Sequence, residues 1–391
     1  MYSILKRLSL LLSVLSLSLI AFCQEVSQEK KGYILVINTY LDSSPWSSHI
    51  IDKIRNDISE PRKNLNLYTE SLHILDIDAK EEMEEIKQDI RRKYKDIKPI
   101  VIVFLGNGAW ALFQEEVQTL WKDIPLVLCA DGQELAPPSC YYLEKEIPWD
   151  SLRPLRESIQ ETKVTVIDCP VHLKGTIQLM QRLLPKMKKI AFISDRRYVS
   201  TIGRKEMKET IENYFPKIQV DYLTEGQLTM DEVIDTLKRY DESTGILYYS
   251  WFQKNMQSGY KYLTTNNYKN IVNLTAHPLF TPIDIGVHDG TMAGGHFYCN
   301  QDLDKTLDNT LKRILSNQPV DSWYTAGEEG NYLCYNVLQK AGISPKLYPK
   351  DAHYYMKPQS FWETNRYTIM GIIFLLLLLW LMYMYLSLIH I

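Results

Sequence analysis

Polar and aromatic side chains follow directly after the short apolar runs of this 391-residue chain. Hydroxyls, amides and carboxylates can fix a small molecule by hydrogen bonds, and aromatic rings can stack on sugars or flat heterocycles. Ligands of open α/β sheets bind beyond the carboxyl ends of the strands. This rule gives a set of candidate ligand-binding residues: Thr39, Tyr40, Ser43, Trp46, Asn107, Gly108, Asp131, Asp195, Tyr198, Trp251 and Asp289.

Ordinary turn chemistry is the alternative interpretation of these candidates, because Asp, Asn, Ser and Gly also cap helices and form turns. For any single residue the two interpretations are equally good. The structural interpretation is stronger for Trp46, since it begins the apolar face of a predicted helix. Trp251 and its neighbour Phe252 favour ligand contact, because the strand before them already supplies its own core residues.

Signals of catalysis are weak in this sequence. Gly106 and Gly108 form only a G-x-G without the third glycine of a dinucleotide-binding loop, and no P-loop, HExxH or GxSxG pattern occurs. His288, Asp289 and His296 fit a polar turn better than a metal cluster. The six cysteines are scattered without CxxC spacing. We therefore expect a protein that is not an enzyme and has neither a cofactor nor a metal site.

The elements that must position the candidates alternate between buried strands and amphipathic helices. The runs Ile34–Ile37 and Ile100–Leu105 are apolar on both faces, as the strands of a covered parallel sheet are. Trp46, Ile50 and Ile54 recur every four residues and so share one helical face. The alternation resumes after an irregular, proline-containing stretch. It predicts an α/β fold of two lobes, each with a parallel sheet flanked by helices, facing a common cleft.

These patterns also predict where each lobe begins and ends. Residues 31–165 are expected to form lobe 1 and residues 166–295 to form lobe 2. Residues 296–362 are expected to return to lobe 1 and lead toward a membrane. Late in lobe 2, Ile271–Leu274 is expected to form a further element.

Apolar segments lie at both ends of the chain. Residues 1–23 combine Lys6 and Arg7 with an apolar run, which is typical of a cleaved export signal; an uncleaved anchor is the alternative. Tyr367–Tyr385 carries no charge and is long enough to cross the roughly 30 Å hydrocarbon layer as a helix. The net charge of −3 gives no reason to expect nucleic acid as a partner. A single-pass membrane protein with an exported main domain is predicted.

Several segments resemble the type I periplasmic-binding-protein sensors. The resemblance is closest to the ABC-substrate-binding-like input domains of bacterial hybrid two-component sensor histidine kinases. Leu338–Pro345 and Lys357–Glu363 resemble the membrane-proximal end of those sensors. The other matching segments are Lys31–Trp46 (KGYILVINTYLDSSPW), Phe104–Trp110 (FLGNGAW), Leu126–Gly132 (LVLCADG) and Asp289–Gly295 (DGTMAGG).

The resemblance implies that a small polar ligand (a sugar, nucleoside or amino-acid-like molecule) binds between two lobes and that a signal passes through the membrane helix. It also implies a homodimeric receptor in the bacterial inner membrane, with the main domain in the periplasm. The sequence departs from the family after Tyr385, where no kinase module follows, and we expect residues 386–391 to be a non-native tail on a fragment. The alternative function is a membrane-tethered substrate-binding protein of an ABC transporter.

Overall fold

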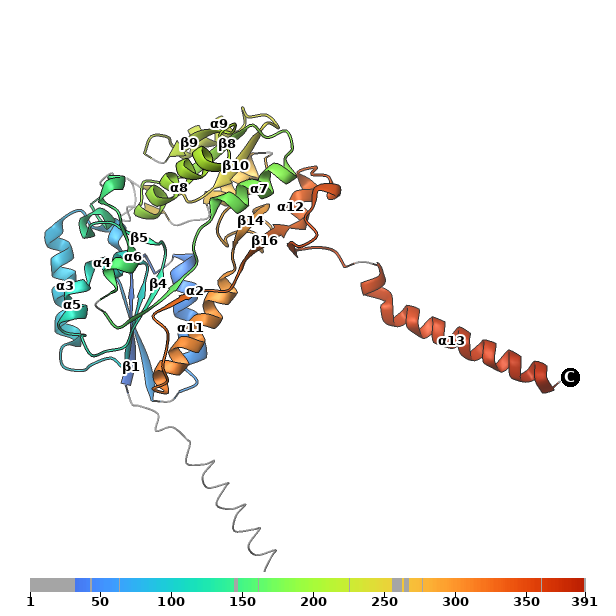
Figure 1. The fold of residues 1–391 in the computed structure, drawn as a ribbon, viewed down its shortest axis with the longest axis horizontal. Helices are drawn as coiled ribbons and strands as arrows, with labels where there is room; N and C mark the ends of the chain where they lie inside the picture. The colour runs from blue at the N-terminus through green and yellow to red at the C-terminus, as the bar shows by residue number, and fades with distance from the viewer. Residues whose placement is uncertain are drawn as a thin grey trace, which may run out of the picture.

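The computed structural model describes residues 32–389, apart from 43, 63, 144–146, 161, 225, 255–261, 264–266, 276 and 360. Two α/β lobes and a long C-terminal helix make up this part of the chain (Figure 1). The predicted export signal over residues 1–23, the candidate Ser43 and the last two residues of the predicted tail lie outside the described residues.

Lobe 1 is built on a six-stranded sheet in which every neighbouring pair is parallel. The sheet order is β15-β7-β4-β3-β1-β2. Its central strands are buried on both faces, as their continuous apolar sequences predicted. The strands are β1 (Gly32–Asn38), β2 (Leu65–Ser71), β3 (Val101–Leu105), β4 (Leu126–Ala130), β7 (Val164–Asp168) and β15 (Trp323–Thr325).

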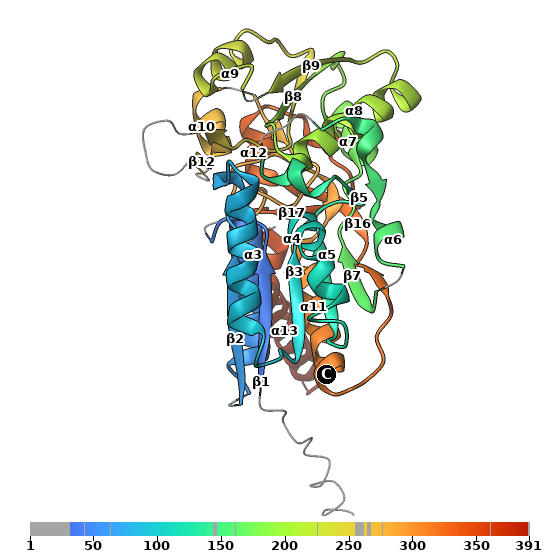
Figure 2. The same cartoon turned by 90° about the vertical axis from the view of Figure 1, so that its left-hand side faces the viewer.

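Helices cover both faces of the lobe 1 sheet (Figure 2). One face carries α3 (Lys80–Tyr94), α4 (Asn107–Leu112) and α5 (Gln114–Gln118). The other carries α2 (Pro45–Lys53), the π-helix η1 (Ile54–Ser59) and α11 (Asn300–Leu315). Short elements complete the lobe: β5 (Glu134–Leu135), β6 (Arg153–Pro154), α6 (Leu155–Ser158), η2 (Ile74–Asp76), η3 (Pro138–Tyr141) and η4 (Trp149–Ser151).

Lobe 2 is built on a seven-stranded sheet in the order β17-β16-β14-β13-β10-β8-β9. The pair β14–β16 is antiparallel, and the other pairs are parallel. The strands are β8 (Lys189–Ser194), β9 (Gln219–Thr224), β10 (Thr244–Tyr248), β13 (Leu279–Phe280), β14 (Gly294–Tyr298), β16 (Glu329–Cys334) and β17 (His353–Tyr355). A two-stranded ribbon, β11 (Gln253–Lys254) with β12 (Tyr262–Leu263), lies after β10.

The lobe 2 sheet is also covered on both faces. One face packs against α7 (Leu173–Leu183), α8 (Tyr198–Tyr214) and α12 (Tyr335–Lys340), followed by the short η5 (Pro345–Leu347). The other face packs against α9 (Met230–Leu237) and α10 (Asn267–Leu274). The element expected at Ile271–Leu274 is therefore the end of α10, which begins at Asn267. A short segment with three apolar residues fits a buried helix face as well as a strand.

The chain crosses between the lobes three times. The crossovers are residues 169–172 between β7 and α7, Cys299 between β14 and α11, and residues 326–328 between β15 and β16. In lobe 1, Asp168 ties the first and third crossovers together, because its Oδ1 accepts hydrogen bonds from Trp323 Nε1 at 3.1 Å and Thr325 Oγ1 at 2.9 Å.

The observed lobes differ from the predicted boundaries after residue 295. Lobe 1 regains only α11 and β15, and the chain then re-enters lobe 2. The expectation that residues 332–362 pack on lobe 1 was therefore wrong. β16 pairs with β14 instead, which buries Leu333 and Cys334 in the lobe 2 core.

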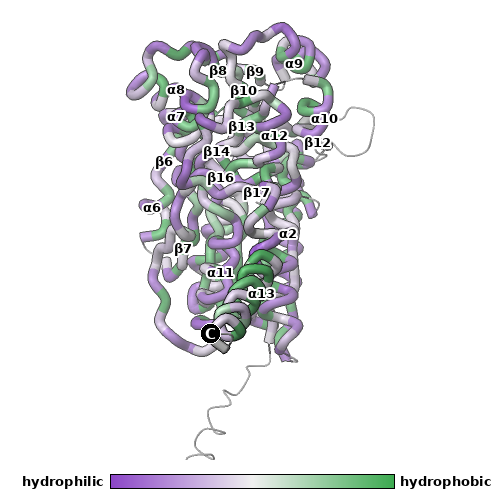
Figure 3. The backbone as a smooth tube through the Cα atoms, turned by 90° about the vertical axis from the view of Figure 1, so that its right-hand side faces the viewer, coloured by the Kyte–Doolittle hydropathy of each residue, from purple (hydrophilic) through white to green (hydrophobic). Residues whose placement is uncertain are grey.

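A long apolar helix, α13 (Phe361–Ile389), leaves lobe 2 shortly after β17. Its span Thr364–Ser387 has a mean hydropathy of 2.5, and none of it is buried against the lobes. Figure 3 shows the contrast between this hydrophobic helix and the mixed hydropathy of the residues along the lobes. The helix is long and apolar enough to cross a membrane, as predicted from Tyr367–Tyr385.

Candidate ligand-binding cleft

The carboxyl ends of β1, β3 and β4 bring the lobe 1 candidates together. The hydroxyl of Tyr40 donates to Asp131 Oδ2, and the backbone N–H of Asn107 donates to Asp131 Oδ1 at 3.0 Å. Thr39 Oγ1 accepts the N–H of Ala109 at 2.8 Å. Parallel strands end at one edge of a sheet, so residues far apart in sequence meet there.

Asp131 is the charged centre of the lobe 1 side. Burial raises the pKa of its carboxyl group, and the hydrogen bonds from Tyr40 and Asn107 and the nearby Arg197 charge only partly offset this effect. A side chain on Gly106 would approach Asp131 Oδ2 to 2.7 Å, and Gly106 has a φ of 87°. The close approach to Asp131 and the positive φ each require glycine at this position.

The lobe 2 side is organised by Asp195, Arg197 and Phe252. Asp195 follows β8, and its Oδ2 pairs with Arg197 Nη2 at 2.9 Å. Burial alone would raise the pKa of Asp195, but the charge and hydrogen bonds of Arg197 outweigh it and hold this pKa below its usual value. The Arg197 guanidinium stacks 3.5 Å from the ring centre of Phe252, whose N–H donates to Asp195 at 3.2 Å.

The lobes touch through a group of residues that we name the cleft contact: Asn107, Glu134 and Tyr141 of lobe 1, with Tyr198 and Lys205 of lobe 2. Asn107 Nδ2 lies 3.2 Å from the Tyr198 hydroxyl, which donates to the Glu134 carbonyl. Lys205 Nζ pairs with Glu134 Oε1 at 2.6 Å. The rings of Tyr141 and Tyr198 lie 4.6 Å apart. Asn107 and Tyr198 were both predicted as candidates. They lie in contact across the two lobes although they are 91 positions apart in the sequence.

Asn107 retains an unused acceptor in this cleft. Its Nδ2 lies within hydrogen-bond distance of the carbonyls of Gly132 (2.8 Å) and Glu134 (2.9 Å). Its Oδ1 is buried and has no hydrogen-bond partner among the described residues. Because an unpaired buried carbonyl is costly, this atom is suited to accept a hydrogen bond from a bound molecule.

Three candidates have mainly structural surroundings. Trp46 packs against the lobe 1 core and meets the Tyr40 ring edge-on, with centroids 6.0 Å apart. A side chain on Gly108 would lie 2.7 Å from Thr39 Cγ2, so Gly108 permits close packing. Trp251 is 2 % exposed and belongs to the lobe 2 core, whereas its neighbour Phe252 contacts Arg197.

Asp289 is not brought to the cleft. It pairs with Lys269 at 3.3 Å, and the adjacent Gly290 lies against Met356, beyond the end of β17. β13 and β14 are parallel, so the connection between them must run back to the opposite edge of the sheet, and it carries Asp289 there.

Arg197 is the residue that sequence reasoning missed. Its neighbour Arg196 is exposed and lies beside Gly226. Adjacent residues before a helix point in different directions, and two consecutive arginines give no sign of which one turns into the cleft. Asp195 was the available signal, because a buried carboxylate needs a cationic partner.

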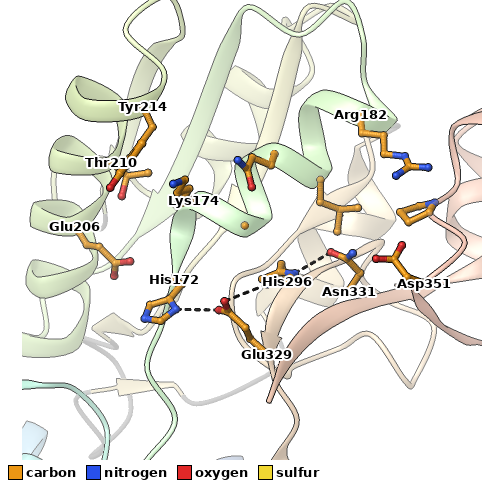
Figure 4. Close-up of a pocket in the computed structure, with 14 residues that line it drawn as sticks. His172, Lys174, Arg182, Glu206, Thr210, Tyr214, His296, Glu329, Asn331 and Asp351 are labelled. Carbon is orange, nitrogen blue, oxygen red and sulfur yellow. Dashed lines mark hydrogen bonds and ion pairs between the residues drawn. The ribbon is translucent and has the colours of Figure 1, made fainter. Parts of the chain in front are cut away.

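A hollow, which we name the α7 pocket, lies on lobe 2 and contains none of the candidates. Its volume is about 560 Å³ and its walls include His172, Glu206, His296 and Glu329. Figure 4 shows Glu329 between two imidazoles: it lies 2.9 Å from His172 Nδ1 and 3.6 Å from His296 Nε2. We name these three residues the hinge cluster, because His172 and Glu329 flank the first and third crossovers.

No group of three or more metal-ligating side chains occurs in the part of the chain that the structure describes. The cysteines described there are all free. The candidates where the lobes meet carry carboxylate groups (Asp131, Asp195), and Arg197 and Phe252 add a guanidinium and an aromatic ring.

No protein-family model and no curated protein sequence matches the chain. Solved structures do match it. A conserved domain protein from Vibrio cholerae O1 biovar El Tor is 13 % identical, with 83 % of this chain and 100 % of that chain covered and a TM-score of 0.56. The ABC domain from Streptococcus pneumonia, solved in complex with L-Trp, is 12 % identical, with 83 % and 100 % covered and a TM-score of 0.50. In architecture, the chain has the two-lobed α/β fold of type I periplasmic binding proteins, with one apolar helix at its C-terminal side.

Proposed function

We propose that the chain is a membrane-anchored, non-enzymatic receptor domain that binds a small polar ligand between its lobes. The observation that carries this proposal is the direct contact of the two lobes beside the candidate residues, where Tyr198 bonds to Asn107 and Glu134, and Lys205 pairs with Glu134. Charged groups that face each other across two lobes can both contact one molecule, so binding favours the closed arrangement.

The residues of the cleft indicate the chemistry of the ligand. Asp131 brings a half-buried carboxylate and Asp195 a buried one, and Arg197 brings one guanidinium that Asp195 already binds. The unpaired Oδ1 of Asn107 is a further acceptor, so acceptors are in excess here. A ligand with hydrogen-bond donors or an amino group therefore fits better than a bare anion, and Phe252 can stack on a flat or sugar ring. Sugars, nucleosides and amino acids remain the classes to test.

We further propose that the output is signalling, as in the periplasmic input domain of a two-component sensor histidine kinase in the bacterial inner membrane. The resemblance of the sequence supports this role, and so does the direct connection of lobe 2 to α13. Tethered substrate binding for an ABC transporter is the second candidate, because the likeness to the Streptococcus ABC domain fits it equally well. The native gene sequence after residue 385 separates the two, since a sensor requires kinase modules there.

A thermal-shift screen of the full chain in detergent tests ligand binding. A true ligand at 100 times its dissociation constant adds about 2.7 kcal/mol to stability. Asp131→Asn should abolish the shift, whereas Asp289→Asn is a matched control at the opposite edge and should keep it. Small-angle scattering should show compaction with the same ligand. The proposal fails if sugars, nucleosides and amino acids produce neither effect, or if the two variants lose binding equally.

A further inference from the structure

The part of lobe 2 that leads into α13 carries an unusual concentration of basic and aromatic side chains. Between residues 335 and 366 there are five cations and two carboxylates (Asp351 and Glu363), although the whole chain has a net charge of −3. We name as the basal face the exposed lysines Lys340, Lys346, Lys350 and Lys357, with the tyrosines Tyr335, Tyr348 and Tyr354.

The tyrosines form one cluster that holds this face together. Ring centroids lie 5.8 Å apart for Tyr335 and Tyr348, and 6.0 Å apart for Tyr348 and Tyr354. Lys357 lies 5.7 Å from the centre of the Tyr354 ring. None of the four lysines has an ion-pair partner within the described ranges of the chain. Their charges are therefore available to an external partner.

The connection to α13 limits how far this face can be from a bilayer. Only residues 356–360 separate β17 from α13, and they span at most about 20 Å when fully extended. Phe361 and Trp362, at the start of α13, are 77 % and 56 % exposed, and aromatic rings there suit the membrane interface. In the proposed topology the lysines lie on the translocated side, where the positive-inside bias does not favour them. Another role must account for them.

We propose that the basal face of lobe 2 rests on anionic phospholipid headgroups, which fix lobe 2 relative to the membrane. Each lysine near such a surface contributes attraction, and tyrosine rings suit the headgroup region. This inference rests on the proposed membrane anchorage and does not depend on the identity of the ligand.

Hydrogen exchange of the full chain in lipid nanodiscs tests the proposal. Residues 335–357 should exchange about tenfold more slowly with phosphatidylglycerol in the disc than with phosphatidylcholine alone, and high salt should remove the difference. The triple variant Lys340→Gln, Lys346→Gln, Lys350→Gln should lose this protection. A matched triple variant on lobe 1, at the exposed lysines Lys95, Lys98 and Lys122, should keep it.

Equal exchange in the two lipids would overturn the proposal, and so would equal loss of protection in the two triple variants. Flotation with vesicles is the separate readout of anchorage: a chain that fails to float contradicts the membrane anchor itself. Ligand-induced thermal shifts report on the cleft, so failure of the anchor, of the lipid contact and of ligand binding can be told apart.

Discussion

The cleft contact between the lobes and the hinge cluster beside the crossovers differ most in their access to water. The cleft contact is buried, with Asn107 fully buried and Tyr198 6 % exposed. In the hinge cluster, the side chains of His172 and Glu329 are 48 % and 39 % exposed. Buried polar contacts are costly to break, whereas exposed ion pairs contribute little because water screens them. We infer that the cleft contact sets the balance between closed and open lobes, while the hinge cluster only aligns the crossovers.

Removing the Tyr198 side chain should have the largest effect. Tyr198→Ala deletes the ring that packs on Tyr141, and truncation of a buried aromatic residue costs about 3 kcal/mol of unfolding free energy. The lobes should also separate, which small-angle scattering would detect as a larger radius of gyration. Tyr214→Ala, at an exposed position of the same helix, is the control and should cost less than about 0.5 kcal/mol.

The milder Tyr198→Phe keeps the ring and loses only the hydroxyl group, at a cost of about 1 kcal/mol. It remains informative if the alanine variant does not fold. An unchanged radius of gyration in both Tyr198 variants would contradict the importance given to the cleft contact.

The pH dependence of the unfolding free energy should come from Glu206, which lines the α7 pocket. Burial raises the pKa of Glu206 from 4.5 to about 7, although the N–H of Leu173 and the charge of His172 oppose this rise. The folded state therefore holds this proton more tightly than the unfolded state, so stability is greatest below the unfolded pKa. It should fall as pH rises from about 4.5 to about 7, by on the order of 1–3 kcal/mol.

Urea unfolding across this pH range would measure the slope. Glu206→Gln should flatten it, because the amide does not titrate. Glu209→Gln, at an exposed position on the same helix, should leave the slope as it is. A slope that survives in Glu206→Gln would assign the pH dependence to another group, such as Asp131.

Breaking the hinge cluster should have the smallest effect. Burial alone would raise the pKa of Glu329, but His172 and His296 more than offset this and hold its pKa below the usual value. The stabilisation is present above the unfolded pKa and is lost as the pH falls. Glu329→Gln should therefore cost less than about 1 kcal/mol near neutral pH and leave the radius of gyration unchanged. A loss as large as that of Tyr198→Ala would reverse the comparison.

The fold could be predicted from the sequence where burial alone decides the structure. β1 and β3 are continuous apolar runs, and such runs with helices between them lead to a covered parallel sheet. The re-entry of the chain into lobe 2 after β15 was not expected from the sequence. Membership of β16 in lobe 2 depends on its antiparallel pairing with β14, for which the local sequence gives no signal.

The positions of candidate residues could be predicted where strand ends determine them. Asn107, Asp131 and Asp195 each follow a buried strand and lie at the cleft. Asp289 follows an apolar run in the sequence, yet its loop returns to the other edge, a distinction that requires the sheet order. Arg197 was missed because the direction of a side chain just before a helix depends on the group with which it pairs, here Asp195. Whether these residues bind a ligand remains a prediction.

The chain enters α13 from β17, an edge strand of lobe 2, whereas lobe 1 reaches α13 only through lobe 2. With α13 in a bilayer, lobe 2 would therefore be the lobe held in place and lobe 1 the lobe that can turn. A turn about the crossovers would sweep lobe 1 through an arc and leave β17 in place. In a dimer, copies that touch through lobe 1 would convert this arc into a new spacing of their membrane helices, and copies that touch through lobe 2 would not.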